Sequence, residues 1–407
     1  MWTPGCRPFL QVGGTTRTGF THRHTPEPVQ LQRSAGRTML GLSCTSSLRR
    51  LVLGFLLMST SLLFFFTYYK YDFKFSSSGL DMRREDLSWS WDQDRDQDRG
   101  VNDTGRVQSE QDTLLLIWMW PFGSPYELSC SIFNVSTCQL TADRSTFPRA
   151  HGVLFHHRDI RQDLDNMPTL PRPCFQKWVW SNMESPANSA PIPELNNIFN
   201  LTCSYRLDSN IPVPYGYLEP LTTQDRSFQL PPKTKLVCWI VSNWNRKHRR
   251  VQYYEELRQH VQIHVYGDAV GQPVSDQDYA HIVSSCKFYL SFENSVHRDY
   301  ITEKLFSPMN LGSVPVVIGP PRQNYEDHVP ADSFIHVDDF SSAKELADRL
   351  SYLDGNTTEY RKLFTWRRRW KVKKSWFGRE QACRTCLYLH RNRHVQVFHE
   401  LNSWFWG

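Results

Sequence analysis

Short apolar runs that end in polar clusters recur along the chain from residue 113 to residue 340. Runs of this length, rich in aromatic and β-branched residues, are typical of buried strands. Helical spacing predicts helices at 249–260 and from Ser342, where Ser342 and Glu345 have capping-box spacing. This alternation predicts an α/β fold on parallel sheets, with ligands at the carboxyl ends of the strands. The expected strands are 113–120, 153–155, 177–180, 236–242, 263–266, 288–290, 314–318 and 334–337.

The stretch 286–321 carries the densest group of ionisable residues at a predicted strand end. Its helix should begin near Ile301, with Asp299 as the cap, and end at Gly312. Pro308 inside this helix predicts a kink or an early end. A strand–helix–strand unit of this size binds ligands beyond its first strand, although a solvated helix cap is the alternative interpretation. The polar residues concerned are Glu293, Asn294, His297, Arg298, Asp299, Tyr300, Glu303 and Lys304.

The first 112 residues differ in character from the rest of the chain. Residues 1–50 are polar and without periodicity, which predicts a disordered cytoplasmic tail. Residues 51–69 carry no charge and are long enough to cross a bilayer as a helix, a signal anchor. A cleaved signal peptide is the alternative, but its apolar core is shorter. Residues 70–112 are polar and should form a stem.

The orientation of this span follows from modification sites, because Lys and Arg are balanced on its two sides. All the N-glycosylation sequons follow the span, as do the cysteines other than Cys6 and Cys44. Both features indicate an oxidising, lumenal C-terminal part, and therefore a single-pass type II membrane protein. The sequons begin at Asn102, Asn134, Asn200 and Asn356.

Charge and spacing exclude some classes of partner. The formal net charge of +6 suits a partner with phosphates without requiring one. The basic run 366–374 is better explained as a solvated helix face than as a nucleic-acid site, so we expect no nucleic-acid partner. His156 and His157 are neighbours on a predicted strand and point to opposite faces, which excludes a shared metal. Asp338–Asp339 fit a cap, so no metal site is expected.

Eight longer sequence blocks carry a family resemblance. They are WPFG (120–123), HHRD (156–159), MESP (183–186), VPYG (213–216), FYLSFENS (288–295), DYITEK (299–304), SVPVVIGP (313–320) and ADSFIHVDDF (331–340). With these blocks, the chain from residue 114 to the C-terminus resembles the Golgi α1,3-fucosyltransferases of Lewis type, glycosyltransferase family 10. The segments LTADRS, KLVCWIVSNWN and the ending WFWG indicate that it is most similar to the fucosyltransferase 9 type.

The resemblance implies a domain layout and a disulfide pattern. The layout is GT-B, with two facing Rossmann-like domains: an acceptor-side domain at 113–225, a GDP-fucose-binding domain at 226–372, and a segment at 373–407 tied back to the first. By spacing alone, the Cys383–Cys386 pair could be redox-active or half a zinc site. The resemblance implies that this pair bonds to Cys130 and Cys138, and that Cys238 bonds to Cys286. Cys174 and Cys203 depart from the family, and our hypothesis is that they pair with each other.

The resemblance also implies a reaction, the inverting transfer of fucose from GDP-fucose to a GlcNAc hydroxyl. Glu184 becomes the general base, although an exposed loop carboxylate is the plain alternative. Arg250 and Lys304 would hold the leaving diphosphate, since Arg offers forked donors and Lys a point charge. Glu303 would bind donor hydroxyls, while Tyr300 and Asn294 would line the nucleotide site and Glu293 could be structural.

Acceptor choice is implied by the residues after the first of the paired histidines: His157, Arg158 and Asp159. In the family, Arg directly after the paired histidines, Arg158 in this chain, goes with α1,3 transfer to Galβ1-4GlcNAc. The resemblance therefore predicts Lewis x-type products on glycoproteins or glycolipids in the Golgi membrane system. No metal is expected to be obligatory, although Mn²⁺ could stimulate the reaction. A transferase for another nucleotide sugar and a non-catalytic lumenal lectin are the rival interpretations.

Overall fold

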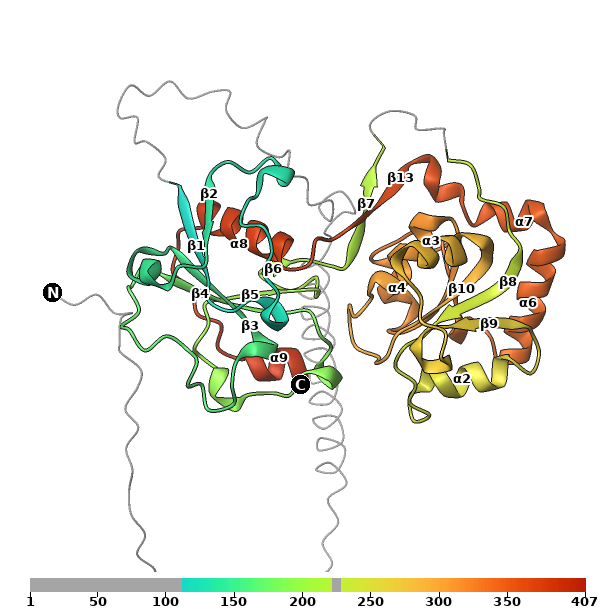
Figure 1. The fold of residues 1–407 in the computed structure, drawn as a ribbon, viewed down its shortest axis with the longest axis horizontal. Coiled ribbons are helices and arrows are strands. Elements are labelled where there is room, and N and C mark those ends of the chain that lie inside the picture. Colours follow the sequence, from blue (N-terminus) through green and yellow to red (C-terminus); the bar gives the residue numbers. More distant parts are fainter. Residues whose placement is uncertain (1–111, 222–227) are drawn as a thin grey trace, which may run out of the picture. The chain divides into compact units, whose positions relative to one another are not determined.

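The computed structural model describes residues 112–221 and 228–407. This part of the chain contains two parallel α/β sheets and a two-stranded antiparallel ribbon, β7 (Gly216–Pro220) with β13 (Trp370–Lys374) (Figure 1). The α/β prediction is therefore confirmed. No helix within the described residues is long and apolar enough to cross a membrane. The predicted tail, span and most of the stem lie outside the described residues, as does the sequon at Asn102.

The first sheet has the strand order β2-β1-β3-β4-β5-β6, and every neighbouring pair is parallel. The chain leaves β1 in one direction to form β2 and then crosses to the other side to form β3. The direction of the strand order therefore reverses between β1 and β3, which is where open α/β sheets bind ligands. The strands are β1 (Thr113–Ile117), β2 (Cys138–Thr141), β3 (Gly152–His156), β4 (Lys177–Asn182), β5 (Leu201–Ser204) and β6 (Ile211–Pro212).

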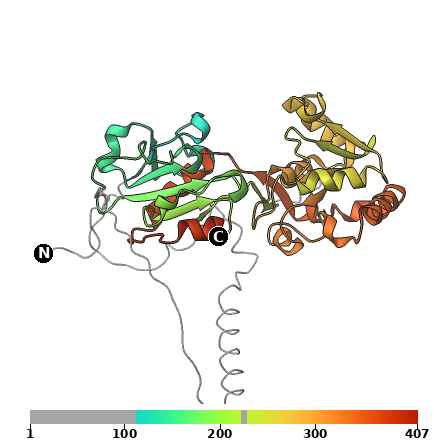
Figure 2. The ribbon, with the colours of Figure 1, turned by 90° about the horizontal axis from the view of Figure 1, so that it is seen from below.

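The C-terminal segment covers both faces of this sheet. Alternate strand residues face opposite sides, so Leu115 packs with α8 (Arg379–Arg391) while Leu116 packs in the cluster that contains α9 (Leu401–Trp406). Figure 2 shows both red helices beside the green strands. Residues far apart in the sequence thus complete one hydrophobic core.

The second sheet has the order β12-β11-β10-β8-β9, again with parallel pairs throughout. Its strand order reverses between β8 and β10. Helices α2 and α6 pack on one face, and α3 and α4 on the other. The strands are β8 (Lys235–Ile240), β9 (Ile263–Tyr266), β10 (Cys286–Phe292), β11 (Val314–Ile318) and β12 (Ile335–His336). The helices are α2 (Arg249–Leu257), α3 (Asp276–Ser285), α4 (Glu303–Leu311), α5 (Arg322–Glu326), α6 (Ala343–Gly355) and α7 (Thr357–Lys362).

Two predictions about helices are wrong. The cap of α4 is Thr302, whose side chain accepts from the backbone N–H of Lys304, because Asp299 is used in tertiary hydrogen bonds described below. The basic run 366–374 is not a helix face, since its second half forms β13. Lys371 and Lys373 alternate there with half-buried Trp370 and Val372, and both lysines pair with Glu219 of β7. Pro308 does not end α4, which continues to Leu311 and stops at left-handed Gly312.

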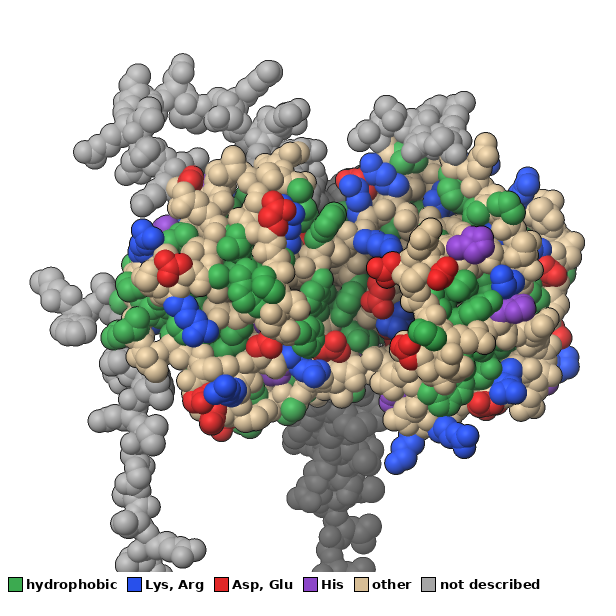
Figure 3. Space-filling view, in the orientation of Figure 1, with side chains coloured by type: hydrophobic (Ala, Val, Ile, Leu, Met, Phe, Trp, Pro, Cys, Tyr) green, Lys and Arg blue, Asp and Glu red, His purple; other side chains and the backbone are tan. Residues whose placement is uncertain are grey.

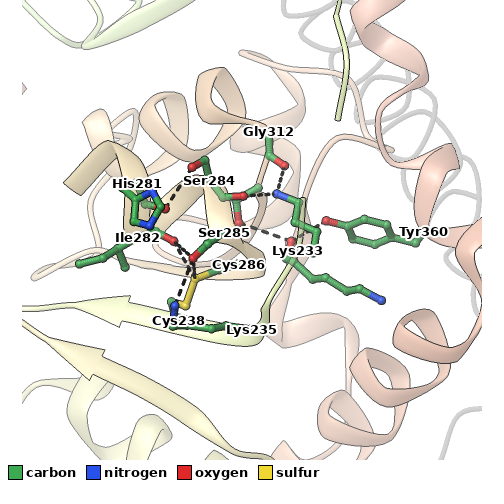
Figure 4. Close-up of a disulfide and its surroundings, with 12 residues drawn as sticks. Lys233, Lys235, Cys238, His281, Ile282, Ser284, Ser285, Cys286, Gly312 and Tyr360 are labelled. Carbon is green, nitrogen blue, oxygen red and sulfur yellow. Dashed lines mark hydrogen bonds between the residues drawn. A yellow bond between two sulfur atoms is a disulfide. The ribbon is translucent and has the colours of Figure 1, made fainter. Parts of the chain in front are cut away.

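Three expected disulfides are present within the described residues. Cys130–Cys383 and Cys138–Cys386 tie α8 to the first sheet, and Cys238–Cys286 joins β8 to β10 (Figure 4). The predicted pairing of Cys174 with Cys203 is wrong. Cys174 is disulfide-bonded, but Cys203 is a free thiol in the core of the first sheet, where burial raises its pKa to about 12. Cys203 packs as a small apolar side chain, a common use of cysteine.

Candidate active site

Arg250 lies at the reversal point of the second sheet. Its guanidinium donates from Nη2 to the backbone oxygen of Asn243, 2.6 Å away, and from Nη1 to that of Phe292, 3.4 Å away. The side chain is 5% exposed, and burial lowers its pKa. No carboxylate within the described residues pairs with it, and its Nε has no hydrogen-bond partner there. The charge of Glu293 opposes part of the effect of burial on this pKa, but it forms no ion pair with the guanidinium, so a buried cation with an unpartnered donor favours an anion here.

Lys304 stands in the first turn of α4 between two carboxylates. Its Nζ is 3.3 Å from Glu293 Oε2 and 3.1 Å from Glu303 Oε1, and it donates to Thr302 Oγ1 at 2.9 Å. Burial acts to lower the pKa of Lys304, but the two carboxylates prevail and hold it above its usual value. Lys304 is therefore charged, and a phosphate could replace the exposed Glu303 as its partner.

Glu293 has a structural role at the N-terminus of α4, a role that the sequence had left open for it. It is 3% exposed and accepts hydrogen bonds from the backbone N–H and the hydroxyl of Thr302, at 2.8 and 2.9 Å. Burial raises its pKa, and the contacts with Lys304 and Thr302 oppose that change. Glu293 thus fixes the N-terminus of α4 and the position of Lys304.

Residues between β10 and α4 tie the second sheet to the first. Asp299 has a positive φ of 59°, and its carboxylate accepts from the backbone N–H of Leu207 and the amide of Asn324. Tyr300 is 3% exposed and packs edge-on against Tyr205 and Tyr215, with ring centroids 5.3 and 6.2 Å apart. Tyr300 therefore sits inside an aromatic cluster, whereas Asn294 is only partly buried and stays accessible.

Glu184 lies just after β4, on a loop that contacts the β10–α4 segment. The hydroxyl of Ser295 donates to that of the adjacent Ser185 at 2.7 Å, and Tyr215 Oη donates to the backbone oxygen of Met183. The Glu184 side chain is partly exposed and makes no hydrogen bond or ion pair within the described residues. A partly exposed carboxylate without a partner can accept a proton from a bound hydroxyl.

His157 is a neutral, buried histidine that anchors the turn after β3. Its Nδ1 accepts from Trp180 Nε1 at 3.1 Å, so its Nε2–H donates to the backbone oxygen of Ala190 at 2.9 Å. Burial lowers the pKa of His157 to about 4. Protonation would place a second N–H against the indole donor and break that hydrogen bond.

This arrangement predicts a pH-dependent stability. The unfolded chain protonates His157 below its ordinary pKa of about 6.5, whereas the folded chain resists protonation down to about 4. Stability should therefore fall as the pH falls from 6.5 towards 4. At pH 5, His157 should lower the free energy of unfolding by about 2 kcal/mol relative to pH 7. Urea denaturation at both pH values, on the wild type and on His157→Gln, checks this; an equal pH dependence in the two proteins would contradict it.

Asp159 links the turn after β3 to the loop after β1. Its carboxylate accepts from His156 Nδ1 at 2.6 Å and from the backbone N–H of Phe122 at 3.0 Å. Arg158 is exposed, donates to the backbone oxygen of Asn188, and lies 5.8 Å from the Phe122 ring centroid. The three residues predicted to choose the acceptor therefore lie together at the carboxyl ends of the first sheet, and Arg158 is the most exposed of them.

Comparison with known proteins decides the family. Residues 110–216 match the family model described as fucosyltransferase, N-terminal, and residues 230–404 match glycosyltransferase family 10 (fucosyltransferase) C-term. The chain belongs to glycosyltransferase family 10, the fucosyltransferases. It is 49% identical over 298 residues to mouse 4-galactosyl-N-acetylglucosaminide 3-alpha-L-fucosyltransferase 9, which covers 73% of this chain and 83% of the relative.

Other relatives agree with this assignment. The human protein of the same name is also 49% identical over 298 residues, and bovine alpha-(1,3)-fucosyltransferase 7 is 42% identical over 311 residues, 75% of this chain and 90% of the relative. Among solved structures, a crystal structure of alpha1,3-fucosyltransferase with GDP-fucose aligns with a TM-score of 0.48 at 17% identity, covering 74% of this chain and 96% of that one. The two family models and the curated relatives make the chain a fucosyltransferase by family membership.

Three residues of the candidate site, Tyr215, Ser295 and Thr302, were not singled out from the sequence. Tyr215, in the block VPYG, carries the hydroxyl that holds the Glu184 loop. The Ser295 hydroxyl holds the Glu184 loop through Ser185, and Thr302 caps the start of α4. Asp338 and Asp339 form ion pairs with Arg249 and Arg322, consistent with a structural use. The blocks themselves were the only signal for Tyr215, Ser295 and Thr302.

The remaining sequons differ in accessibility. Asn134 is exposed at a left-handed turn, and Asn356 is half-buried at the start of α7. Asn200 is 6% exposed, and its amide donates to the backbone oxygen of Gln396 at 2.7 Å. Glycosylation at each of these sites stays a prediction.

Proposed function

We propose that this fucosyltransferase moves fucose from GDP-fucose in α1,3 linkage to the GlcNAc of Galβ1-4GlcNAc glycans, with inversion at the anomeric carbon. The 49% identity to a relative named 4-galactosyl-N-acetylglucosaminide 3-alpha-L-fucosyltransferase, over 83% of that relative, carries this proposal. Arg158 in the turn after β3 supports the choice of a type 2 acceptor. The products are then Lewis x-type structures on glycoproteins or glycolipids.

The proposed reaction is a single displacement, and a named side chain assists each part of it. Glu184 takes the proton from the 3-hydroxyl of GlcNAc, and that oxygen attacks C1 of fucose. The bond from C1 to the β-phosphate oxygen breaks, and GDP leaves as the anion. Arg250 supplies the buried positive charge for the diphosphate, and Lys304 joins it when Glu303 turns from the lysine to the donor hydroxyls. Asn294 lines the nucleotide site, and Tyr300 supports that site from within the aromatic cluster.

The domain layout follows from the same proposal. Residues 113–225 form the acceptor-side domain, residues 226–372 form the donor domain of a GT-B enzyme, and residues 373–407 return to the first domain. With a cytoplasmic tail at 1–50, a signal anchor at 51–69 and a stem at 70–112, the protein would be a type II Golgi membrane protein with a lumenal catalytic part. The lumenal disulfides support an oxidising compartment.

An acceptor competition in EDTA tests the proposed specificity. The enzyme is incubated with GDP-fucose and an equimolar mixture of Galβ1-4GlcNAc and Galβ1-3GlcNAc, with EDTA in place of added metal. We expect fucosylation of the first disaccharide to continue in EDTA, and little fucosylation of the second. Mass spectrometry of each product measures the ratio. Equal transfer to both acceptors would contradict the role of Arg158, and complete loss in EDTA would contradict metal-independent departure of GDP.

A further inference from the structure

One buried carboxylate, that of Asp299, connects the first body, built on the first sheet, with the second body, built on the second sheet. Asp299 is 2% exposed and lies three residues before Thr302, the cap of α4. Its Oδ2 accepts from the backbone N–H of Leu207, in the turn between β5 and β6, at 3.1 Å. Its Oδ1 accepts from the amide of Asn324, in α5, at 2.6 Å. Each oxygen of this carboxylate therefore holds a different body.

The second body holds Asp299 through more than one hydrogen bond. The side-chain oxygen of Asn324 also accepts from the backbone N–H of Asp299, at 2.6 Å. His328, whose side chain is 4% exposed, places Nε2 3.5 Å from Oδ1. Burial acts to raise the pKa of Asp299, but its hydrogen bonds, first that from His328, prevail and hold it below its usual value. The carboxylate is therefore ionised, which makes it a stronger acceptor than a neutral group.

The backbone of Asp299 lies in a conformation that few residue types adopt. Its φ of 59° is in the left-handed region, where Asp and Asn are enriched among residues with a side chain. A tight turn follows, in which the N–H of Ile301 donates to the backbone oxygen of Asp299 at 2.8 Å. Such conformations persist where the surrounding contacts over-determine them. The contacts of Asp299 thus set the path of the chain into the first turn of α4.

The two bodies that Asp299 joins carry different groups of the proposed reaction. Lys304 stands in the first turn of α4, in the second body, whereas Glu184 follows β4 in the first body. Leu207 follows β5, the neighbour of β4, so Leu207 and Glu184 both lie beyond the carboxyl ends of adjacent strands. A change in the contact between Asp299 and Leu207 would therefore alter the separation of Glu184 from Lys304 while leaving each body intact.

We propose that Asp299 is a positioning residue for fucosyl transfer, which sets the place of Lys304 relative to Glu184. The inference rests on the proposed function, since that function gives Glu184 and Lys304 their roles. Both oxygens of Asp299 are occupied by donors from the protein, so Asp299 acts through the placement of other residues. Its loss should lower kcat and leave the affinity for the donor nucleotide unchanged.

Asp299→Asn tests this role with a small change. Asparagine tolerates the left-handed backbone, but its NH₂ group must face a donor, either the N–H of Leu207 or the amide of Asn324. One body therefore loses its hold, and kcat should fall about ten- to a hundredfold, as for a misplacement of up to 1 Å. The Kd of GDP, measured by calorimetry, should be unchanged, because Arg250 and Lys304 both belong to the second body.

Exchanging the two side chains should restore kcat. In the double variant Asp299→Asn, Asn324→Asp, the carboxylate at position 324 accepts from the amide and the backbone N–H of residue 299. The amide oxygen at position 299 then accepts from the N–H of Leu207. Each donor again faces an acceptor, so the double variant should be faster than Asp299→Asn alone, a coupling expected only of residues in direct contact.

The matched control is Asp208→Asn, the same substitution one residue after Leu207. Asp208 pairs with Arg298 at 3.1 Å, but the two side chains are 31% and 61% exposed. Figure 3 shows acidic and basic side chains interspersed over the visible face, and exposed pairs of this kind contribute little to stability. The kcat of this variant should therefore equal that of the wild type.

Hydrogen exchange at the amide of Leu207 reads the contact without turnover. Exchange should be slow in the wild type, faster in Asp299→Asn and slow again in the double variant. If Asp299→Asn does not fold, Asn324→Ala replaces it, because that change removes the hold of α5 alone and should also lower kcat.

Three results would overturn the role of Asp299. They are a wild-type kcat in the folded single variant, a loss of GDP affinity as large as the loss of kcat, and a folded double variant as slow as the single one. The expected exchange rates at Leu207, together with no fucosyl transfer by the wild type, would support the contact and contradict the proposed function instead.

Discussion

Replacing Glu184 by Gln should lower the rate of fucosyl transfer by about 10²- to 10⁴-fold, the range that a general base contributes. The carboxylate is partly exposed and unengaged, so the amide should fit without disturbing the loop. The neighbouring Ser185–Ser295 hydrogen bond does not involve the Glu184 side chain and should persist. Product formation under saturating donor, measured as GDP released and as product mass, gives the effect on kcat.

The matched control for this variant is Glu194→Gln, an exposed carboxylate in the same half of the chain. It should leave kcat unchanged. The Glu184 variant should also bind GDP-fucose with the wild-type affinity in calorimetry, because Glu184 acts on the acceptor proton. Full turnover by a folded Glu184→Gln protein would place the base elsewhere.

Replacing Arg250 by Lys should lower kcat/KM by about 10²- to 10³-fold, the cost of losing one charged group at the leaving oxygens. The guanidinium is fixed by the backbone oxygens of Asn243 and Phe292, and it retains donor capacity for a phosphate. A lysine ammonium cannot span both oxygens and still present a donor fork. We expect weaker binding of GDP as well, since the buried positive charge is displaced.

Arg258→Lys is the control, because Arg258 is 54% exposed and pairs only with Glu255 among the described carboxylates. Thermal unfolding of both variants separates a folding defect from a binding defect. GDP affinity equal to wild type in a folded Arg250→Lys protein would remove Arg250 from the diphosphate site.

Much of this fold was predictable because its central strands carry short, mostly apolar runs. The runs at β3, β10 and β11 are buried on both faces and read as strands without ambiguity. Strands β2, β5 and β6 have no counterpart among the expected strands. They are short, and β2 is only partly buried, so their sequences give a weak signal.

Tertiary use of a residue explains the predictions that are wrong. Asp299 and Thr302 are both good helix caps, but Asp299 is drawn into hydrogen bonds with Leu207 and Asn324, residues distant in the sequence. Counting cysteines suggested a bridge for Cys203, whereas the core uses its side chain as a small apolar group. The alternation of Trp370 and Val372 with lysines was visible in the sequence, but its partner strand β7 was not.

The site residues, like the fold, were predictable from the sequence only in part. The order of the elements put Lys304 and Glu184 beyond the ends of predicted strands, whereas Arg250 was named only from the family resemblance. The sequence could not show that Arg250 lacks a carboxylate partner or that Lys304 has two, because these depend on side chains from separate strands and helices. The contacts that fix each side chain therefore required the structure.

The linkage of the product tests the central claim most directly. The purified enzyme is incubated with GDP-fucose and N-acetyllactosamine, and the product is analysed by two-dimensional NMR. The account predicts one fucose, joined through an α-anomeric bond to O3 of GlcNAc, with one GDP released for each fucose transferred. Fucose attached to galactose, a β-anomeric product, or no product from the folded enzyme would contradict it.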